Sequence, residues 1–386
     1  MKKKILLGHL NSNGDCLFVT VIARQIKEVD YPDSHLTWAV GARSRQAVEL
    51  NPYVDEIWEI PTEKTLATQE EWRTFVTEAE ERKREGDFDL LFFTQVIGEN
   101  EINYDGGIRS SIYNNYPHKI TVPFQPVIRL SDAEVENVRR FAEKHELGKY
   151  RQVILVECAP ASFDVALNPQ SAYQLASEII AEDETVAVIL SSNMAVESSS
   201  PNIIDASELT FRENAELTKY CTLFVGCASG ISWLVMSDWA KQLDMILVIN
   251  QHHNVLPSMI YDLEYWKLPA GHIIEVRNDG DSLRKVKACI AQVWAQGFES
   301  ARETFNEKIR LSNYSFLDTQ IIGTATRLDF AGLFACLRRV VRRNGIHFNL
   351  IAQLLKTGLE LSRITANKLL RVLGLKQGEE LANQHK

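Results

Sequence analysis

The chain has 386 residues, 45% of them hydrophobic and 24% charged, so it can bury a large core and should divide into more than one domain. The formal net charge of −9 and the lack of a recognition motif argue against a nucleic-acid partner. No apolar run approaches the roughly 20 residues that span a bilayer, and the apolar stretch of MKKKILLGHL is too short for a signal peptide. We therefore expect a globular, cytoplasmic protein.

Apolar segments alternate with helical segments in the first part of the chain. The expected strands are KKILLGHL, HLTWAV, EIWEIP, FDLLFFTQ and HKITVPF, and the expected helices cover 14–28, 43–50 and 66–85. After a helix over 132–147 and the polar stretch GKYRQ, the pattern starts again with VILVE, TVAVILSS, NIIDAS, TLFVGC, MILVIN and HIIEVR. Alternating strands and helices predict two α/β units, each with a parallel sheet.

Small and polar residues follow several of these strands. Examples are NSNGD after the first strand and ECAPASFD, SSNM, CASG and NQHHN in the second unit. Ligands of open parallel sheets bind beyond the carboxyl ends of the strands, so these segments should share one rim with a ligand. The small residues of GCASG, 226–230, would let a ligand approach backbone N–H groups at a helix start, although a tight turn explains them as well.

Two segments resemble family 9 glycosyltransferases, the heptosyltransferase-like enzymes. The first is ILLGHLNSNGDCLF followed by NPYVDEI, and the second is TLFVGCASGISWLVMSD. The resemblance covers about residues 1–280 and implies the α/β fold called GT-B, in which two Rossmann-like domains face a cleft. The helical C-terminal extension that we expect lies outside this resemblance and follows from the spacing of apolar residues there. We expect an acceptor domain over 1–147, a nucleotide-sugar donor domain over 148–310 and a basic helical extension over 311–386.

The chain also departs from that family. APASFDVALNP lacks the basic, Trp-containing segment that usually follows the first strand of the second domain, and Cys227 and Trp233 stand where acidic and His residues are usual. Even with these departures, the resemblance implies transfer of a sugar from a nucleotide sugar to a bacterial surface glycan, such as lipopolysaccharide, O-antigen or capsule. It leaves a family 99 enzyme, which uses CMP-linked Kdo (3-deoxy-manno-octulosonic acid), as an alternative.

Glycosyl transfer needs a carboxylate that takes the proton of the acceptor hydroxyl or attacks the anomeric carbon. Asp15 matches the family's base by position, but an Asp there can also cap a helix. Glu157 ends the apolar strand VILVE, where burial should raise its pKa unless a cation pairs with it. Asp238 lies further along the helix that follows GCASG, so we expect a solvated or helix-bonded role for it and not catalysis.

The remaining candidates divide between the two domains. On the acceptor side they are Asn11, Asn13 and Gly14. On the donor side they are Ser162, Ser191, Ser192, Asn193, Cys227, Ser229, Gly230, Ser232, His252 and His253. We expect no metal and no cofactor besides the nucleotide-sugar co-substrate, since the D-F-D sequence at 87–89 precedes its strand and lies at the wrong rim.

Two other function classes stay open. Cys227 lies near a helix start, where a thiol can be activated as a nucleophile. The departures from the family pattern also fit a non-catalytic module that binds a sugar nucleotide. The six cysteines form no CxxC pair and no zinc pattern, so we expect reduced thiols.

The C-terminal region differs in charge from the rest. Residues 338–376 contain nine Lys or Arg and one acid, Glu360, or +8, which leaves −17 for the remainder. Apolar residues recur there at helical spacing, and RNG marks a break. These helices either pack on the body or dock on the inner, anionic face of a membrane or on an acidic partner enzyme. The expected partners are thus a nucleotide sugar, a glycan or lipid-linked glycan acceptor and one of these surfaces.

Overall fold

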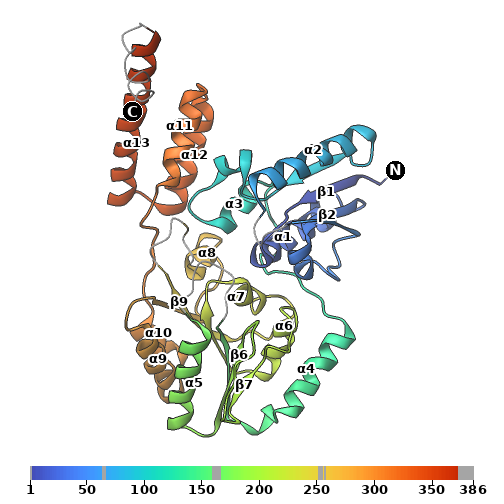
Figure 1. Ribbon diagram of the computed structural model, residues 1–386, viewed down its shortest axis with the longest axis vertical. Helices are drawn as coiled ribbons and strands as arrows, with labels where there is room; N and C mark the ends of the chain where they lie inside the picture. Colours follow the sequence, from blue (N-terminus) through green and yellow to red (C-terminus); the bar gives the residue numbers. More distant parts are fainter. Residues whose placement is uncertain (1, 63–66, 159–166, 251–254, 256–257, 373–386) are drawn as a thin grey trace, which may run out of the picture. The chain divides into compact units, whose positions relative to one another are not determined.

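The structure is a computed structural model that describes residues 2–62, 67–158, 167–250, 255 and 258–372 (Figure 1). It divides into two compact units. The larger unit, the body, contains Met1–Gln251 and Leu256–Arg310, and the smaller unit, the appendage, contains His252–Val255 and Leu311–Lys386. Both predicted sheets lie in the body. The predicted domain boundaries after 147 and 310 stay predictions.

The first lobe of the body is built on a four-stranded parallel sheet in the order β3-β2-β1-β4. β1 is central and buried, and its Leu6 pairs with Thr37 on one side and Leu91 on the other. Continuous apolar strands of this kind form because helices cover both faces of a parallel sheet. The strands are β1 (Lys4–Gly8), β2 (His35–Gly41), β3 (Glu56–Ile60) and β4 (Leu90–Phe93).

The second lobe is built on a six-stranded parallel sheet in the order β10-β9-β8-β5-β6-β7. Counted from β5, this is the doubly wound Rossmann order, with the reversal between β5 and β8. The strands are β5 (Gln152–Glu157), β6 (Val186–Ser191), β7 (Ile203–Asp205), β8 (Leu223–Cys227), β9 (Asp244–Ile249) and β10 (Ile273–Arg277). The core of this lobe gathers side chains from its sheet and from α5, α9 and α10.

Local signals in the sequence set the helix ends. Thr68 and Glu71 form a capping box at the start of α2, and Gly86, with φ of +91°, ends that helix in the left-handed conformation that glycine favours. The helices of the first lobe and the linker are α1 (Asn13–Gln25), α2 (Gln69–Glu85), α3 (Ile108–Asn114) and α4 (Asp132–Lys144). Those of the second lobe are α5 (Pro169–Glu182), α6 (Glu213–Leu217), α7 (Gly230–Leu234), α8 (Met259–Tyr265), α9 (Ser282–Gln296) and α10 (Phe298–Phe305).

Two expected elements are wrong. HKITVPF is not a strand, because its backbone N–H groups bond to side chains of α1 and not to a neighbouring strand. The N–H groups of Thr121 and Val122 donate to Gln25 Oε1 at 2.8 and 3.2 Å, and the segment lies among prolines that have no N–H. The helix expected over 43–50 is a shorter 3₁₀ helix, Ala42–Ala47.

The appendage consists of α11 (Phe316–Thr326), α12 (Phe330–Asn344) and α13 (Phe348–Val372), with α12 and α13 both packed on α11. Gly345, with φ of +74°, separates α12 from α13 at the predicted RNG break. The predicted fold class is therefore confirmed: two parallel α/β sheets with a helical C-terminal extension. Among the helices of the described residues, none is both long and apolar enough to cross a bilayer.

Candidate functional site

Several predicted site residues follow the strands at which each sheet reverses its order. In the first lobe the reversal is between β1 and β4, and the loop after β1 carries Asn11, Asn13 and Gly14 into α1. In the second lobe it is between β5 and β8, which end at Glu157 and Cys227. Crevices at such points are where open α/β sheets bind ligands. The structure thus places both predicted carboxylates beside a switch point.

Gln95, which follows β4, fixes the loop after β1. Its Oε1 accepts from the N–H groups of Leu10 and Asn11 at 2.9 and 3.2 Å, and its Nε2 donates to Asn11 O at 2.6 Å. Within the described residues, Asn11 Nδ2 and Asn13 Oδ1 are buried atoms without a hydrogen-bond partner. The loop is therefore held through its backbone, and two of its side chains keep unused hydrogen-bonding capacity.

Asp15 lies in the first turn of α1 and keeps part of its surface exposed. Burial raises the pKa of its carboxyl above the usual value, while the Arg109 charge and hydrogen bonds from Ser12 oppose the rise. The Ser12 hydroxyl donates to Asp15 Oδ2 at 3.4 Å. A carboxylate with a raised pKa accepts a proton more readily than an ordinary Asp, as a general base requires.

Arg109, at the start of α3, was not predicted as a site residue. Its Nη1 lies 3.0 Å from Oδ2 of Asp262 on α8, and the two side chains are 11% and 1% exposed. The guanidinium also lies 4.7 Å from the ring centre of Trp233 and 5.5 Å from that of Phe18. Arg109 thus connects the two lobes beside Asp15. The sequence gives no signal for a pair whose members are 153 residues apart.

The GCASG turn is closed by its own side chains. Ser229 caps α7: its Oγ accepts from the N–H groups of Ile231 and Ser232 at 3.1 and 3.3 Å. In return, Ser232 Oγ accepts from Ser229 N at 3.0 Å and donates to the carbonyl of Cys227. These hydroxyls have a structural role, and a role in donor binding stays a prediction.

Gly14 and Gly230 bring the first turns of α1 and α7 together. A Cβ on Gly14 would lie 3.1 Å from the Cα of Gly230, and one on Gly230 would lie 3.3 Å from the N of Gly14. Contacts this close between a Cβ and backbone atoms leave almost no room for a side chain. Gly230 of GCASG therefore serves a close approach of two backbones, one from each lobe.

Glu157 and Cys227 are neighbours in the core of the second lobe. Both are buried, and the Cys227 thiol donates to Glu157 Oε2 at 3.8 Å. A Cβ on Gly226 would lie 3.2 Å from the same oxygen. A carboxylate next to a thiol disfavours the thiolate, and this opposes Cys227 as a nucleophile. All six cysteines lie in the described part of the chain, are buried and form no disulfide.

The other donor-side candidates are spread over the rim. Ser191 is buried and donates to Asn214 Oδ1 at 2.8 Å, while Asn193 is exposed and Ser192 Oγ accepts from the N–H of Met194 at 3.1 Å. Ser162, His252 and His253 lie outside the described residues.

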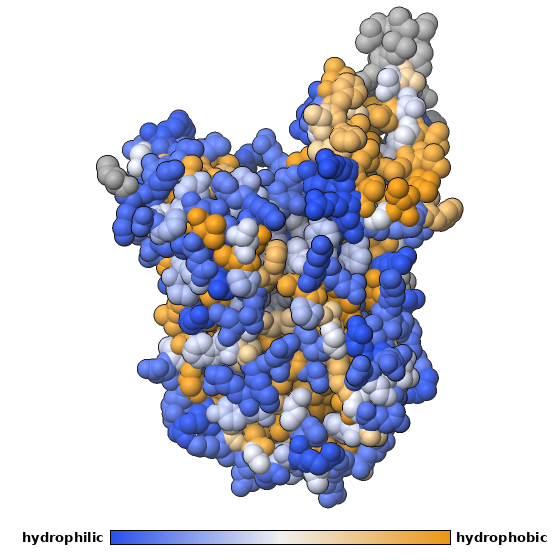
Figure 2. All heavy atoms as spheres, turned by 180° about the vertical axis from the view of Figure 1, so that it is seen from behind, coloured by the Kyte–Doolittle hydropathy of each residue, from blue (hydrophilic) through white to orange (hydrophobic). Residues whose placement is uncertain are grey.

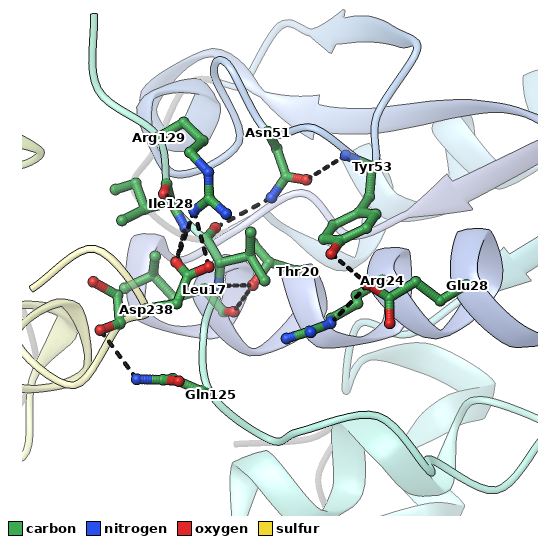
Figure 3. A network of polar contacts seen from close by, with 12 residues as sticks. Leu17, Thr20, Arg24, Glu28, Asn51, Tyr53, Gln125, Ile128, Arg129 and Asp238 are labelled. Carbon is green, nitrogen blue, oxygen red and sulfur yellow. Dashed lines mark hydrogen bonds and ion pairs between the residues drawn. The ribbon is translucent and has the colours of Figure 1, made fainter.

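A second junction between the lobes contains residues from two segments that resemble family 9 sequences (Figure 3). These segments are NPYVDEI and TLFVGCASGISWLVMSD. Asp238 binds Arg129 Nη1 with both oxygens at 2.9 Å and accepts from the N–H of Ile128 at 3.1 Å. Asn51, the first residue of NPYVDEI, donates to Val127 O at 3.2 Å and accepts from the N–H of Tyr53 at 3.0 Å. Asp238 lies beyond Leu234, the last residue of α7, and forms an ion pair with Arg129 in place of the solvated or helix-bonded role that was predicted.

The acids of D-F-D lie at the opposite end of the first sheet from Asp15. Asp87 pairs with Arg82 at 3.0 Å, and Asp89 Oδ2 accepts from Lys4 N at 2.8 Å. Asp89 thus holds the amino end of β1, and Asp87 is paired with the last turn of α2. In the described part of the chain, no three His, Cys, Asp or Glu side chains are grouped as metal ligands.

Comparisons with known proteins identify the fold. No family model matches the chain, and no curated protein does. A solved structure of a glycosyl transferase of family 9 from Veillonella parvula DSM 2008 aligns at 14% identity and a TM-score of 0.52, over 79% of this chain and 97% of that one.

Two further structures align less well. The E. coli ADP-heptose LPS heptosyltransferase II has 13% identity and a TM-score of 0.49 over 76% of this chain and 99% of that one. A UDP-N-acetylglucosamine 2-epimerase from Listeria monocytogenes, described as putative, has 11% identity and a TM-score of 0.45 over 85% and 97%. The fold assignment rests on the Veillonella structure, and with it the chain is shown to have a divergent GT-B fold that is similar to that of a family 9 glycosyl transferase.

Proposed function

We propose that the protein is a glycosyltransferase that moves a sugar from a nucleotide-sugar donor to a bacterial surface glycan. The observation that carries the proposal is the position of Asp15 at the switch point of the first sheet, where the residue is half-buried and burial raises the pKa of its carboxyl. The likeness of the fold to a glycosyl transferase of family 9 supports the reaction class.

In the proposed reaction, Asp15 takes the proton of an acceptor hydroxyl. The acceptor oxygen forms a bond to the anomeric carbon, the bond from that carbon to the phosphate oxygen breaks, and the nucleotide leaves with the bonding electrons. The raised pKa supports Asp15 as the base, and the positive charge of Arg109 opposes the rise that burial causes. Glu157, which is buried against Cys227, is the second candidate for a catalytic carboxylate.

The donor would be held by the loops after β5, β6 and β8 of the second lobe, where the predicted residues lie. The Trp233 indole N–H is a buried donor without a partner within the described residues, and it adds hydrogen-bonding capacity on this side. We further propose that transfer needs no metal, so a chelator should leave the rate unchanged. A rate that EDTA abolishes and Mg²⁺ restores would contradict this part.

A thermal-shift panel tests the donor site. The panel contains ADP, UDP, GDP and CMP, their common sugar conjugates and CMP-Kdo, each added to the full-length protein. A ligand at about 100 times its Kd should stabilise the folded protein by about 2.7 kcal/mol. If no nucleotide raises the melting temperature, the donor site as proposed does not exist.

A transfer assay then separates an enzyme from a binding module. The donor found in the panel is incubated with lipopolysaccharide or lipid-linked glycan as acceptor, and release of the nucleotide is measured. An enzyme releases nucleotide only with the acceptor and in step with the glycan product. Binding without release in any acceptor fraction would indicate a non-catalytic sugar-nucleotide module.

A further inference from the structure

The helices α12 and α13 of the appendage carry an unusual set of exposed apolar side chains (Figure 2). Orange, apolar side chains gather over the appendage in this view, while blue predominates on the body. Among the described residues, eleven large hydrophobic side chains are exposed, and eight of them lie within 328–359: Leu328, Phe330, Phe334, Ile346, Phe348, Ile351, Leu355 and Leu359. Isolated exposed apolar residues are ordinary, but a concentration of this kind marks an interaction site.

On α13 the apolar residues lie opposite the face that packs on α11. Asp318 of α11 accepts from Gln353 Nε2 at 2.7 Å and from Thr357 Oγ1 at 2.5 Å, and these contacts fix the inner face of α13. With 3.6 residues per turn, Leu355 and Leu359 lie on the other side, where they are 66% and 74% exposed. The apolar stripe is therefore not part of the appendage's own core.

The same arrangement recurs on α12. Cys336 and Val340 are buried, and the Cys336 thiol contacts Gln320 Oε1 of α11 at 3.0 Å. The opposite side of α12 carries Phe334, which is 68% exposed, and then the exposed Arg338 one turn later. Both helices thus present a face of large apolar side chains that continues into basic ones.

The positive charge of residues 338–376 favours an anionic partner. Residues 338–376 carry +8, while the rest of the chain carries −17. Lys356 and Arg363 are exposed and flank the apolar stripe of α13. Aliphatic and aromatic side chains flanked by Lys and Arg are the composition of helices that lie in the interface of an anionic bilayer. The basic surface also repels a second copy of itself, which disfavours self-association.

We propose that the outer faces of α12 and α13 dock the protein on an anionic phospholipid surface. Phe330, Phe334, Leu355 and Leu359 enter the boundary between headgroups and acyl chains, and the neighbouring Arg and Lys side chains bind lipid phosphates. The inference stands apart from the glycosyl-transfer proposal, since it depends only on the appendage.

Cosedimentation of the full-length protein with vesicles tests the proposal. Vesicles that contain phosphatidylglycerol are compared with vesicles of phosphatidylcholine alone, at low and at high salt. We expect at least about tenfold tighter binding to the anionic vesicles and a loss of that preference at high salt. Equal binding to both vesicle types, or binding to neither, would overturn the proposal.

Variants separate the contribution of the apolar side chains to vesicle binding from that of the basic side chains. L355S/L359S removes apolar side chains that are already exposed, so the fold should survive while vesicle binding falls at least about tenfold. M194S is its matched control, because Met194 is an apolar side chain of the body that is 62% exposed. For the charge, R338Q/R342Q should weaken binding by about fivefold per residue, with K83Q/R84Q on α2 as the control.

The outcomes stay distinguishable from failure of the glycosyltransferase proposal. Each appendage variant should keep the nucleotide-induced thermal shift of the parent, because its substitutions lie outside the body. Unchanged vesicle binding by both double variants would overturn the membrane surface even if donor binding is normal. So would a parent protein that forms a dimer in solution which L355S/L359S dissociates, because the stripe would then bind a second copy.

Discussion

The helices α1 and α7 begin in similar ways, but the serines at their N-caps make different hydrogen bonds. Each follows the carboxyl end of a strand at a switch point, each has a Ser at its N-cap and each has a Gly in its first turn. In α7 the Ser229 hydroxyl accepts from two N–H groups of the helix. In α1 the Ser12 side chain makes no cap bond and donates to the carboxylate of Asp15.

The difference shows that a glycine- and serine-rich turn is not by itself a ligand cradle. The GCASG turn satisfies its own polar groups and packs on Gly14. The NSNGD turn uses its serine to tune a carboxylate and leaves buried polar atoms of Asn11 and Asn13 without a partner within the described residues. The chemistry is therefore expected at α1, and four predictions test that contrast.

Arg109→Met should have the largest effect, because Arg109 packs between Phe18 of α1 and Trp233 of α7. The substitution removes the guanidinium partner of a carboxylate, Asp262, that is 1% exposed. We expect a loss of about 3 to 5 kcal/mol in the free energy of unfolding, measured by denaturant titration. The double variant R109M/D262L, which removes both charges, should recover much of it. A single-variant loss below about 1 kcal/mol would mean that the pair of Arg109 and Asp262 contributes little to joining α3 and α8.

Asp15→Asn should lower turnover at least about a hundredfold, because it removes the proposed base. The unfolding free energy should stay close to that of the parent, since the amide oxygen still accepts from Ser12. The rate is measured with the donor that the thermal-shift panel identifies. Near-normal turnover would move the catalytic role to Glu157 or elsewhere and would remove the functional side of the contrast between α1 and α7.

Ser229→Ala and Ser12→Ala should differ in their effect on the free energy of unfolding. Ser229→Ala removes a hydroxyl that accepts from two N–H groups, and we expect a loss of about 1 kcal/mol in the free energy of unfolding. Ser12→Ala should cost less than about 0.5 kcal/mol, because its side chain caps no N–H group. Equal losses in the two variants would show that the serines have the same function.

The smallest effect concerns pH. The proposed base is active when ionised, so kcat/KM falls as the pH drops through the Asp15 pKa, which burial raises above the usual range. The Ser12 hydroxyl holds that pKa down, and Ser12→Ala should therefore move the acidic limb of the pH profile to higher pH. Ser229→Ala should leave the limb in place. A limb that moves in both variants, or in neither, would contradict the assignment of Ser12 to Asp15.

The fold was largely predictable from the sequence. VILVE, TLFVGC and MILVIN are continuous apolar runs, as buried parallel strands require, and each is a strand in the second sheet. HKITVPF has the same appearance and is not a strand. Its backbone partner is the side chain of Gln25, 96 residues away, and a local pattern holds no information about such a contact.

The candidate site was predictable only in part. The position of Asp15 after a strand and before a helix placed it beside a switch point. Gln95 and Arg109 were missed because their importance comes from contacts across the fold, with the loop after β1 and with Asp262. The close contact of Gly14 with Gly230 was missed for the same reason, since each glycine alone fits an ordinary turn.

The contact between Gly14 and Gly230 has a consequence for motion. A two-lobed protein usually changes shape by rotating its lobes about a few points, and backbones that touch without intervening side chains can pivot with little sliding. If the lobes rotate about this contact, Asp15, one residue from the pivot, moves little relative to α7, while loops far from it sweep through larger distances. Asp15 would then keep its position beside α7 during such a rotation, and most of the change in shape would fall to the distant loops.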